Sequence, residues 1–133
     1  MRKDHWIDAG ENDNAIVQTL TKTPGALGVF GYSFLEENGD KVKGMPINGI
    51  RPTPSTISDG SYPLSRSLYI YVKKANIGVT KGLQEFVNEY VSDAATGRCG
   101  YLSQRGLIAL PAGQHAGQQG VAQKLTPMAR PAS

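Results

Sequence analysis

The residues best suited to chemistry are the short polar side chains before a predicted helix. The turn Gly10-Glu11-Asn12-Asp13-Asn14 leads into a segment whose apolar residues Ile16, Val17 and Leu20 share one helical face. Asn12 or Asp13 suits the N-cap position, because a short polar side chain can accept a hydrogen bond from an open amide. Free amides and the positive end of the helix dipole also favour an anion. An ordinary helix cap and an anion site therefore both remain open, and the carboxylates of this turn would repel a dianion unless one of them accepts its proton.

Patterns for catalysis, nucleotide binding and metal binding are absent. The glycines of residues 25–31 lack the Lys-Ser/Thr ending of a P-loop, and they lie inside an expected strand. His5 and His115 are near opposite ends of the chain, and no Gly-x-Ser-x-Gly elbow is present. The lone Cys99 excludes an intrachain disulfide. We therefore expect a protein that is not an enzyme and needs no metal or cofactor.

Composition and charge fit one small, loop-rich domain. The 133 residues include 16 glycines and 8 prolines, and 14 basic against 11 acidic residues give a net charge of +3. The basic residues are scattered rather than gathered in a stripe, which argues against nucleic-acid binding. No apolar run is long enough to span a membrane, and no apolar stretch follows the basic start as in a signal peptide. Expressed as written, the chain is expected in the cytoplasm.

Short helices and short strands are expected to alternate along the chain, which places it in the α/β class. Caps, prolines and glycines mark the helix ends, and β-branched or aromatic runs mark the strands. The expected helices are 12–22, 33–37, 53–60, 79–91 (closed by Gly97) and a short one within 101–106; the expected strands are 26–32, 42–50 (interrupted at Pro46) and 67–72. From Ala112 onward we expect weak helical character at best.

The run Ser67-Leu68-Tyr69-Ile70-Tyr71-Val72 is the strongest strand signal. Its β-branched and aromatic composition is typical of a strand covered on both faces. The chain offers few other strong strands to flank it, and an exposed strand edge pairs readily with another chain. We therefore expect a partner fragment, a homo-oligomer that supplies the edge, or marginal stability.

Five segments together resemble the high-affinity phosphate-binding proteins of ABC importers (PstS type), which belong to the type II periplasmic binding proteins. The segments occur in the family's order and at its spacing, and the resemblance covers nearly all of residues 5–111. The end of the family is also matched by Leu125-Thr126-Pro127-Met128. The matching segments are 8–18, 24–35, 47–54, 60–73 and 100–108.

This resemblance implies a partial fold of that type. Residues 1–111 would be the C-terminal part of a phosphate-binding domain, in which about residues 1–50 complete the second lobe. Residues about 60–111, starting with the return segment 62–72, would belong to the first lobe. Residues 112–133 would be a Gly/Gln-rich, weakly ordered tail.

The resemblance also implies a function: the phosphate-binding component of an ABC import system, in truncated or incomplete form. Inorganic phosphate and the permease subunits would be its partners, and the compartment would be the periplasm. A homo-oligomer or a missing N-terminal half would complete it. The alternative is a ligand-free interaction protein, a remnant of the fold that pairs through its exposed sheet edge.

The resemblance transfers no main phosphate ligand to this sequence. The family's Ser-Gly-Thr segment, its nearby arginine and the first-lobe hydroxyl and carboxylate ligands lie upstream of the segments present here. What remains near the cleft are Asn12, Asp13, Asn14, Tyr32 and Ser33. We expect these five residues to act as supports or secondary phosphate contacts.

Overall fold

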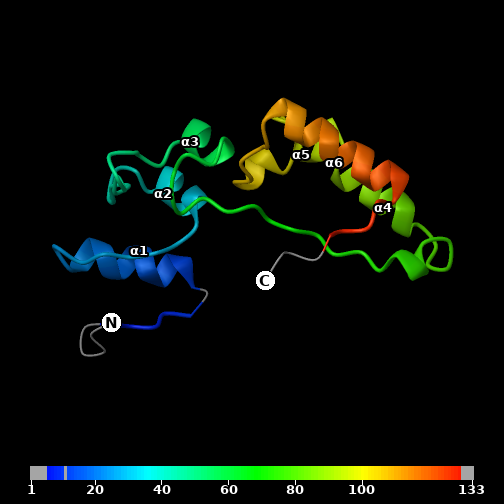
Figure 1. Ribbon diagram of the computed structural model, residues 1–133. Helices are drawn as coiled ribbons and strands as arrows, with labels where there is room; N and C mark the ends of the chain where they lie inside the picture. The colour runs from blue at the N-terminus through cyan, green and yellow to red at the C-terminus, as the bar shows by residue number, and fades with distance from the viewer. Residues whose placement is uncertain (1–5, 11, 130–133) are drawn as a thin grey trace. The chain divides into compact units, whose positions relative to one another are not determined.

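The computed structural model describes residues 6–10 and 12–129 of the chain, as two compact units (Figure 1). Unit 1 is Met1–Pro46 and unit 2 is Ile47–Ser133. Each unit is described by itself below. Among the described residues, no helix is both long enough and apolar enough to cross a membrane.

Unit 1 contains two helices that pack together, α1 (Asp13–Lys22) and α2 (Tyr32–Glu37). Its one buried apolar side chain among the described residues is Val17. The connection between the helices passes close over α1 at Gly28, where a Cβ atom would lie 2.9 Å from both Ile16 Cγ2 and Leu20 Cδ1. Glycine at this position therefore allows the backbone to approach the apolar face of the helix.

The boundaries of α1 follow the sequence signals. The Asn12 side chain accepts a hydrogen bond from the backbone N–H of Ala15, so Asn12 is the N-cap, and the helix ends before Thr23. Gly25 follows with a φ of +84°, a left-handed conformation that favours glycine. The prediction of a capped helix in this segment is confirmed.

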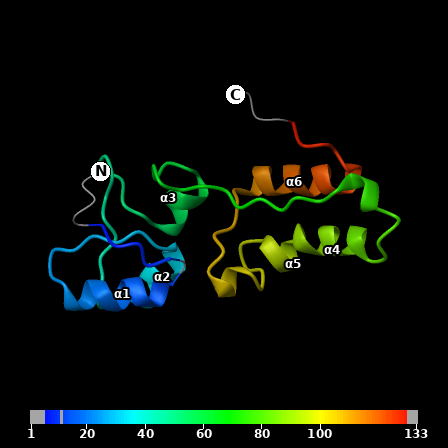
Figure 2. The same cartoon turned by 90° about the horizontal axis from the view of Figure 1, so that it is seen from below.

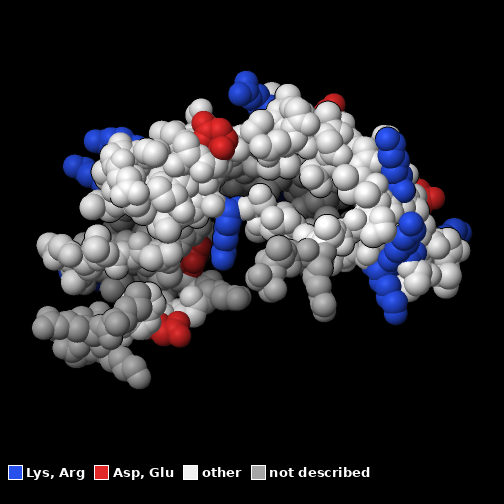
Figure 3. All heavy atoms as spheres, in the orientation of Figure 1, with Lys and Arg blue, Asp and Glu red and all other residues white. Residues whose placement is uncertain are grey.

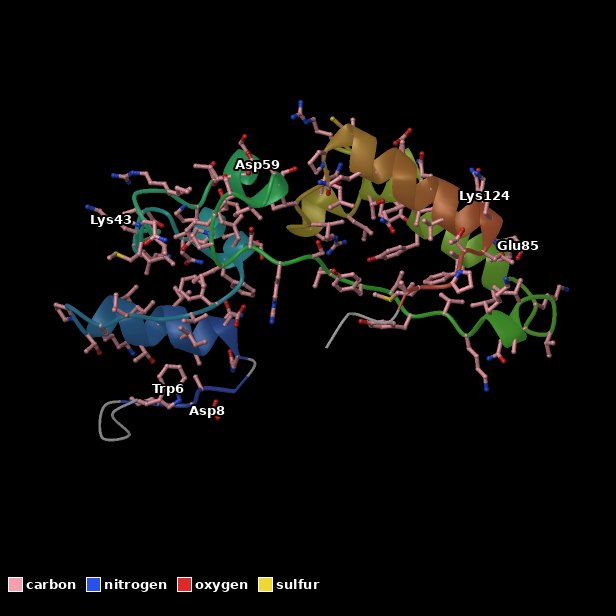
Figure 4. The ribbon with its side chains drawn as sticks, viewed as in Figure 1. Trp6, Asp8, Lys43, Asp59, Glu85 and Lys124 are labelled. Atoms are coloured by element: carbon pink, nitrogen blue, oxygen red, sulfur yellow. The ribbon has the colours of Figure 1, made fainter. Side chains whose placement is uncertain are left out.

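Unit 2 holds the remaining helices, and its core lies between α4 and its neighbours. Helices α4 and α6 run side by side in both ribbon views (Figures 1 and 2), and α4 also packs against α5. The buried side chains here are Val87, Ala95, His115 and Ala122. Glu85 of α4 and Lys124 of α6 are exposed on this helix pair (Figure 4). The elements of unit 2 are α3 (Pro54–Ser58), η2 (Lys74–Asn76), α4 (Leu83–Tyr90), α5 (Asp93–Thr96), η3 (Ser103–Arg105) and α6 (Ala112–Lys124).

Helix α3 has both of its predicted end signals. Thr53 and Thr56 form a reciprocal capping box, and Pro54 takes the first helical position, where its missing N–H costs no hydrogen bond. Gly60 follows the helix with a φ of +77°. Both ends of this short helix are therefore marked by local residues, and the Ser58 hydroxyl at its end also donates a hydrogen bond to the distant Ala109 carbonyl.

The helix expected over residues 79–91 is shorter and is followed by a second helix. Gly82, with a φ of +81°, lies directly before α4, and α4 ends at Tyr90. Ser92 then caps the short α5 by accepting a hydrogen bond from the backbone N–H of Ala95. Gly97 therefore closes α5 rather than the long helix that the apolar spacing predicted. A new N-cap inside the periodic segment ended one helix and began another.

The three expected strands form no β-ladder. The described residues contain no β-strand, only isolated bridges between Ile47 and Ile50 and between Ile77 and Thr80. Residues 26–31 and 66–73 have neither helical nor strand structure. The α/β detail is therefore not confirmed, because a strand exists only through hydrogen bonds to a neighbouring strand, and neither unit supplies one.

The C-terminal segment is more helical than the sequence indicated. Residues 112–124 form α6, a helix of 13 residues, although its sequence contains three glycines. The helix buries His115 and Ala122 and packs against α4. Tertiary packing therefore outweighs the low intrinsic helix propensity of this segment.

Candidate functional site

All five expected site residues lie at the starts of the two helices of unit 1, and a hydrogen bond joins these two helix starts. The backbone N–H of Gly31, the N-cap of α2, donates to Asp13 Oδ2 of α1 at 3.1 Å. A Cβ at Gly31 would lie 3.3 Å from that oxygen and 3.9 Å from Ser33 Oγ, so the carboxylate and the hydroxyl flank the same glycine. Asp13, Gly31 and Ser33 thus form one polar cluster.

Asn12 borders this cluster as the cap of α1. Its Oδ1 accepts a hydrogen bond from the Ala15 N–H at 3.1 Å. The side-chain oxygen is therefore occupied, while no hydrogen bond of the NH₂ group to another described residue is found, so that group could donate to a ligand. Asn12 therefore acts as the N-cap of α1. This agrees with the interpretation of the turn as an ordinary helix cap, the other interpretation being an anion site.

Tyr32 is the first residue of α2 and is tied to its own helix. Burial is the main cause that raises the pKa of its phenol, and the Glu36 carboxylate one turn later raises it further by its charge and by a hydrogen bond. The phenol therefore stays neutral at ordinary pH. After burial, Glu36 of the same helix is the neighbour that affects the Tyr32 phenol most.

Asn14, the second residue of α1, lines a separate hollow of about 290 Å³. The hollow carries one charged side chain, Lys41, whose Nζ donates to Asn38 Oδ1 at 3.5 Å. The other lining residues are Val17, Gln18 and Thr21. The structure thus does not bring Asn14 together with the Asp13–Ser33 cluster.

The electrostatics of the cluster limit what it can bind. Its charged member, Asp13, is negative, and neighbouring donors are the Asn12 amide and the Ser33 hydroxyl. An anion can lie beside a carboxylate without strong repulsion only if one of the two carries a proton that both share. The cluster therefore suits a secondary contact to a protonated oxyanion better than a primary anion site.

A second polar arrangement, in unit 2, was not predicted from the sequence. His115 Nε2 of α6 lies 3.0 Å from Thr96 Oγ1, and its Nδ1 lies 3.2 Å from Asp93 Oδ1. This hydroxyl–imidazole–carboxylate order resembles a catalytic triad. However, Thr96 Oγ1 also lies 3.1 Å from the Tyr90 carbonyl oxygen, which competes for its hydrogen, and the imidazole is buried. The arrangement therefore joins helices and presents no activated nucleophile.

No local signal could have identified these contacts. Asp13 and Gly31 are 18 residues apart, and Thr96 and His115 are 19 residues apart, so both pairs depend on tertiary packing. Within the described part of the chain, no group of three or more His, Cys, Asp and Glu side chains is placed to hold a metal ion.

The chain belongs to the PBP superfamily, since the PBP superfamily domain model matches residues 3–94. No solved structure gave a significant match.

Curated relatives give more detail. The chain is similar to the phosphate-binding protein PstS of Staphylococcus saprophyticus, with 37% identity over 111 residues, or 80% of this chain and 34% of the relative. It is 39% identical over 97 residues to PstS of Staphylococcus epidermidis, covering 69% of this chain and 30% of that protein. PstS of Staphylococcus aureus is 37% identical over 109 residues, covering 77% of this chain and 33% of the relative. The chain thus spans about a third of the length of the curated relatives it matches.

Proposed function

We propose that the chain is a non-catalytic, phosphate-binding component of an ABC phosphate importer, in an incomplete form. The observation that carries this proposal is the identity of 37% to a phosphate-binding protein, maintained over 111 residues. In this role its partners are inorganic phosphate and the permease subunits of the importer, and its compartment is the periplasm.

Within that function, the chain supplies the C-terminal part of an α/β, type II binding-protein fold. About residues 1–50 complete the second lobe, residues about 60–111 return to the first lobe, and 112–133 follow as a tail. The chain's span of about a third of its relatives supports this incomplete character. The expected strands would then form their ladders only beside polypeptide outside this sequence.

Asn12, Asp13, Tyr32 and Ser33 would border the phosphate cleft, and Asn14 would support the first turn of α1. The Ser33 hydroxyl beside the Asp13 carboxylate is a donor–acceptor pair that a protonated phosphate can use, because it can both accept and donate a hydrogen bond. We expect the main charge contacts to come from the absent part.

A complementation titration tests this function. The purified chain is mixed with the remaining, upstream part of the S. saprophyticus PstS, and phosphate binding is measured by calorimetry with sulfate as the control anion. The expected result is saturable heat with phosphate from the mixture, weakened by Ser33→Ala, and none from either piece alone. A folded, associated mixture that gives no heat with phosphate would contradict the proposal.

A second candidate function is that of an interaction protein that binds another polypeptide without phosphate. One observation favours it: Leu68, Tyr69 and Tyr71 are 73%, 64% and 76% exposed, unusually high for such residues in a row. In this case phosphate would have no effect on the partner's binding.

A further inference from the structure

Residues 66–73 of unit 2 form an extended segment whose backbone hydrogen-bonding groups are open up to residue 72, whereas the Lys73 carbonyl accepts a hydrogen bond from the Asn76 N–H. No hydrogen bond in the described structure uses the N–H or C=O of residues 66–72, and the segment belongs to no helix or strand. It crosses unit 2 between α3 and η2 (Figure 1). We call these eight residues the open strand. An extended backbone with unpaired N–H and C=O groups is a template for an added β-strand.

The side chains of the open strand already have the alternation of a β-strand. The Tyr69 and Tyr71 rings stack with their centroids 6.2 Å apart, as residues two apart do on one face of a strand. Leu68, Ile70 and Val72 alternate with them. Both tyrosines are well exposed, whereas on the other side Leu68 is 73% exposed, Ile70 is 40% exposed and Val72 is partly buried, so exposed apolar surface is present on both sides of the segment. An added strand would cover apolar surface as well as satisfy backbone groups.

Positively charged residues lie at both ends of this apolar run. Arg66 lies at one end and Lys73 and Lys74 at the other, and the sequence contains no acidic residue between Asp59 and Glu85. Among the residues that the structure describes, none of these three cations has an ion pair, and Figure 3 shows Lys and Arg side chains projecting from the surface. A strand laid along this segment meets uncompensated positive charge at both of its ends.

This charge pattern disfavours a second copy as the occupant. Antiparallel pairing centred on Ile70 would place Arg66 opposite Lys74, and parallel pairing in register would place each cation opposite itself. Like charges directly opposite each other destabilise a strand pair. A partner strand with acidic residues at both ends would instead place a negative charge beside a positive charge at each end. This holds for parallel and for antiparallel pairing, because both ends of the open strand are positive.

We propose that the open strand binds an extended segment of another polypeptide, with alternating apolar residues in its centre and acidic residues at both ends. This inference develops the second candidate function and is independent of phosphate binding. Backbone pairing and apolar contact would supply affinity, and the flanking charges would select the partner.

Three synthetic peptides test the inference. They share one alternating Val/Thr core and differ only in their flanking residues, which are Glu, Gln or Lys, and their binding to the full chain is followed by fluorescence anisotropy at low salt. We expect the Glu peptide to bind best and the Lys peptide worst. The expected difference between the Glu and Lys peptides is about tenfold, because the 1.4 kcal/mol of a tenfold change lies within the range of two cross-strand charge pairs of about 0.2–1 kcal/mol each.

Variants locate the binding. Ile70→Pro removes a backbone donor from the open strand and should abolish binding, because proline cannot join a ladder on its paired side. Val29→Pro is the matched control, since Val29 is 74% exposed in the other extended segment of the chain. The double variant R66E/K73E should reverse the preference in favour of the Lys peptide. All these positions are exposed, so the folded helices should keep their circular dichroism spectrum.

The other possible results of these experiments would each contradict a different part of the inference. Equal binding of all three peptides would show that the open strand pairs with a peptide but does not select it by charge, and this would overturn the proposed charge selection. Absence of any binding would overturn both the inference and the second candidate function, while the phosphate proposal would stand or fall by its own titration. A dimer in sedimentation that Ile70→Pro dissociates would show that a second copy is the occupant, and would likewise overturn the inference.

Discussion

His115 Nδ1 of α6 lies 3.2 Å from Asp93 Oδ1 of α5, and the opposite nitrogen of the same ring lies 3.0 Å from Thr96 Oγ1. One buried imidazole therefore links the last helix of unit 2 to both ends of a helix of four residues. A helix this short has little stability of its own, so such links hold it in place. The Asp93 side chain is 86% exposed. The contact of His115 with Asp93 should therefore contribute less to stability than its contact with Thr96.

Substitution of His115 should destabilise unit 2 more than substitution of its exposed partner. His115→Ala removes a buried ring and its bond to Thr96, and we expect a loss of about 2 kcal/mol in the free energy of unfolding. Asp93→Asn should cost less than about 1 kcal/mol, because solvent competes for the contacts of an exposed carboxylate. Urea unfolding followed by circular dichroism measures both, with the exposed neighbour variant Gln114→Ala as the control. Equal losses from His115→Ala and Gln114→Ala would contradict the role of the ring.

Two glycines of unit 2 should respond to alanine in opposite directions. A Cβ at Gly100 would lie 2.3 Å from the Ala95 carbonyl oxygen, so Gly100→Ala forces the backbone to move and should cost about 2 kcal/mol or more. Gly113 lies inside α6 with no atom within 4 Å of a Cβ, so Gly113→Ala should stabilise by about 0.5–1 kcal/mol. Thermal unfolding of the two variants compares them directly. A stable Gly100→Ala variant would mean that the turn after α5 is looser than the structure shows.

The sequence predicted those features of the fold that neighbouring residues decide. Asn12 caps α1, and Thr53 with Pro54 starts α3, because capping is a hydrogen bond within one turn of the chain. Helix α6 could not be predicted in this way. Its glycines disfavour a helix locally, and the helix exists through packing of residues such as Ala122 on α4.

The candidate site shows the same limit. The helix start that carries Asn12 and Asp13 was visible in the sequence, but the hydrogen bond from Gly31 to Asp13 and the separation of Asn14 from Ser33 were not. The strand expected at residues 67–72 is a different case. Its composition predicted burial on both faces, whereas Leu68 is 73% exposed. The composition of a segment can favour a strand, but the neighbouring strand that would pair with it has to come from another part of a polypeptide.

Loss of the N-cap of α1 should destabilise the first turn of α1 and leave the neighbouring helix α2 unaffected. Asn12→Ala removes the acceptor for the Ala15 N–H, which should cost about 1 kcal/mol of local stability. Hydrogen exchange of the α1 amides, measured by NMR, should become about fivefold faster, since about 1 kcal/mol corresponds to roughly that factor. Asn14→Ala is the matched control, because the Asn14 side chain is exposed and makes no hydrogen bond to another residue that the structure describes. Equal acceleration by both variants would show that Asn12 does not act as the cap.

The ionisation of Tyr32 should make α2 sensitive to alkaline pH. Burial first, and the Glu36 carboxylate second, raise the pKa of the phenol above its usual 10.0. A raised pKa in the folded state means that the proton is held more tightly there than in the unfolded chain. Its contribution to stability is therefore fully present below pH 10.0 and is lost as pH rises through the folded pKa. An NMR titration of the Tyr32 ring should give a midpoint above 10.0. Glu36→Gln should lower that midpoint only in part, because burial is the larger cause, and Tyr32→Phe should remove this part of the alkaline loss of stability. A midpoint at 10.0 in the unsubstituted chain, or complete loss of the shift in Glu36→Gln, would contradict this assignment.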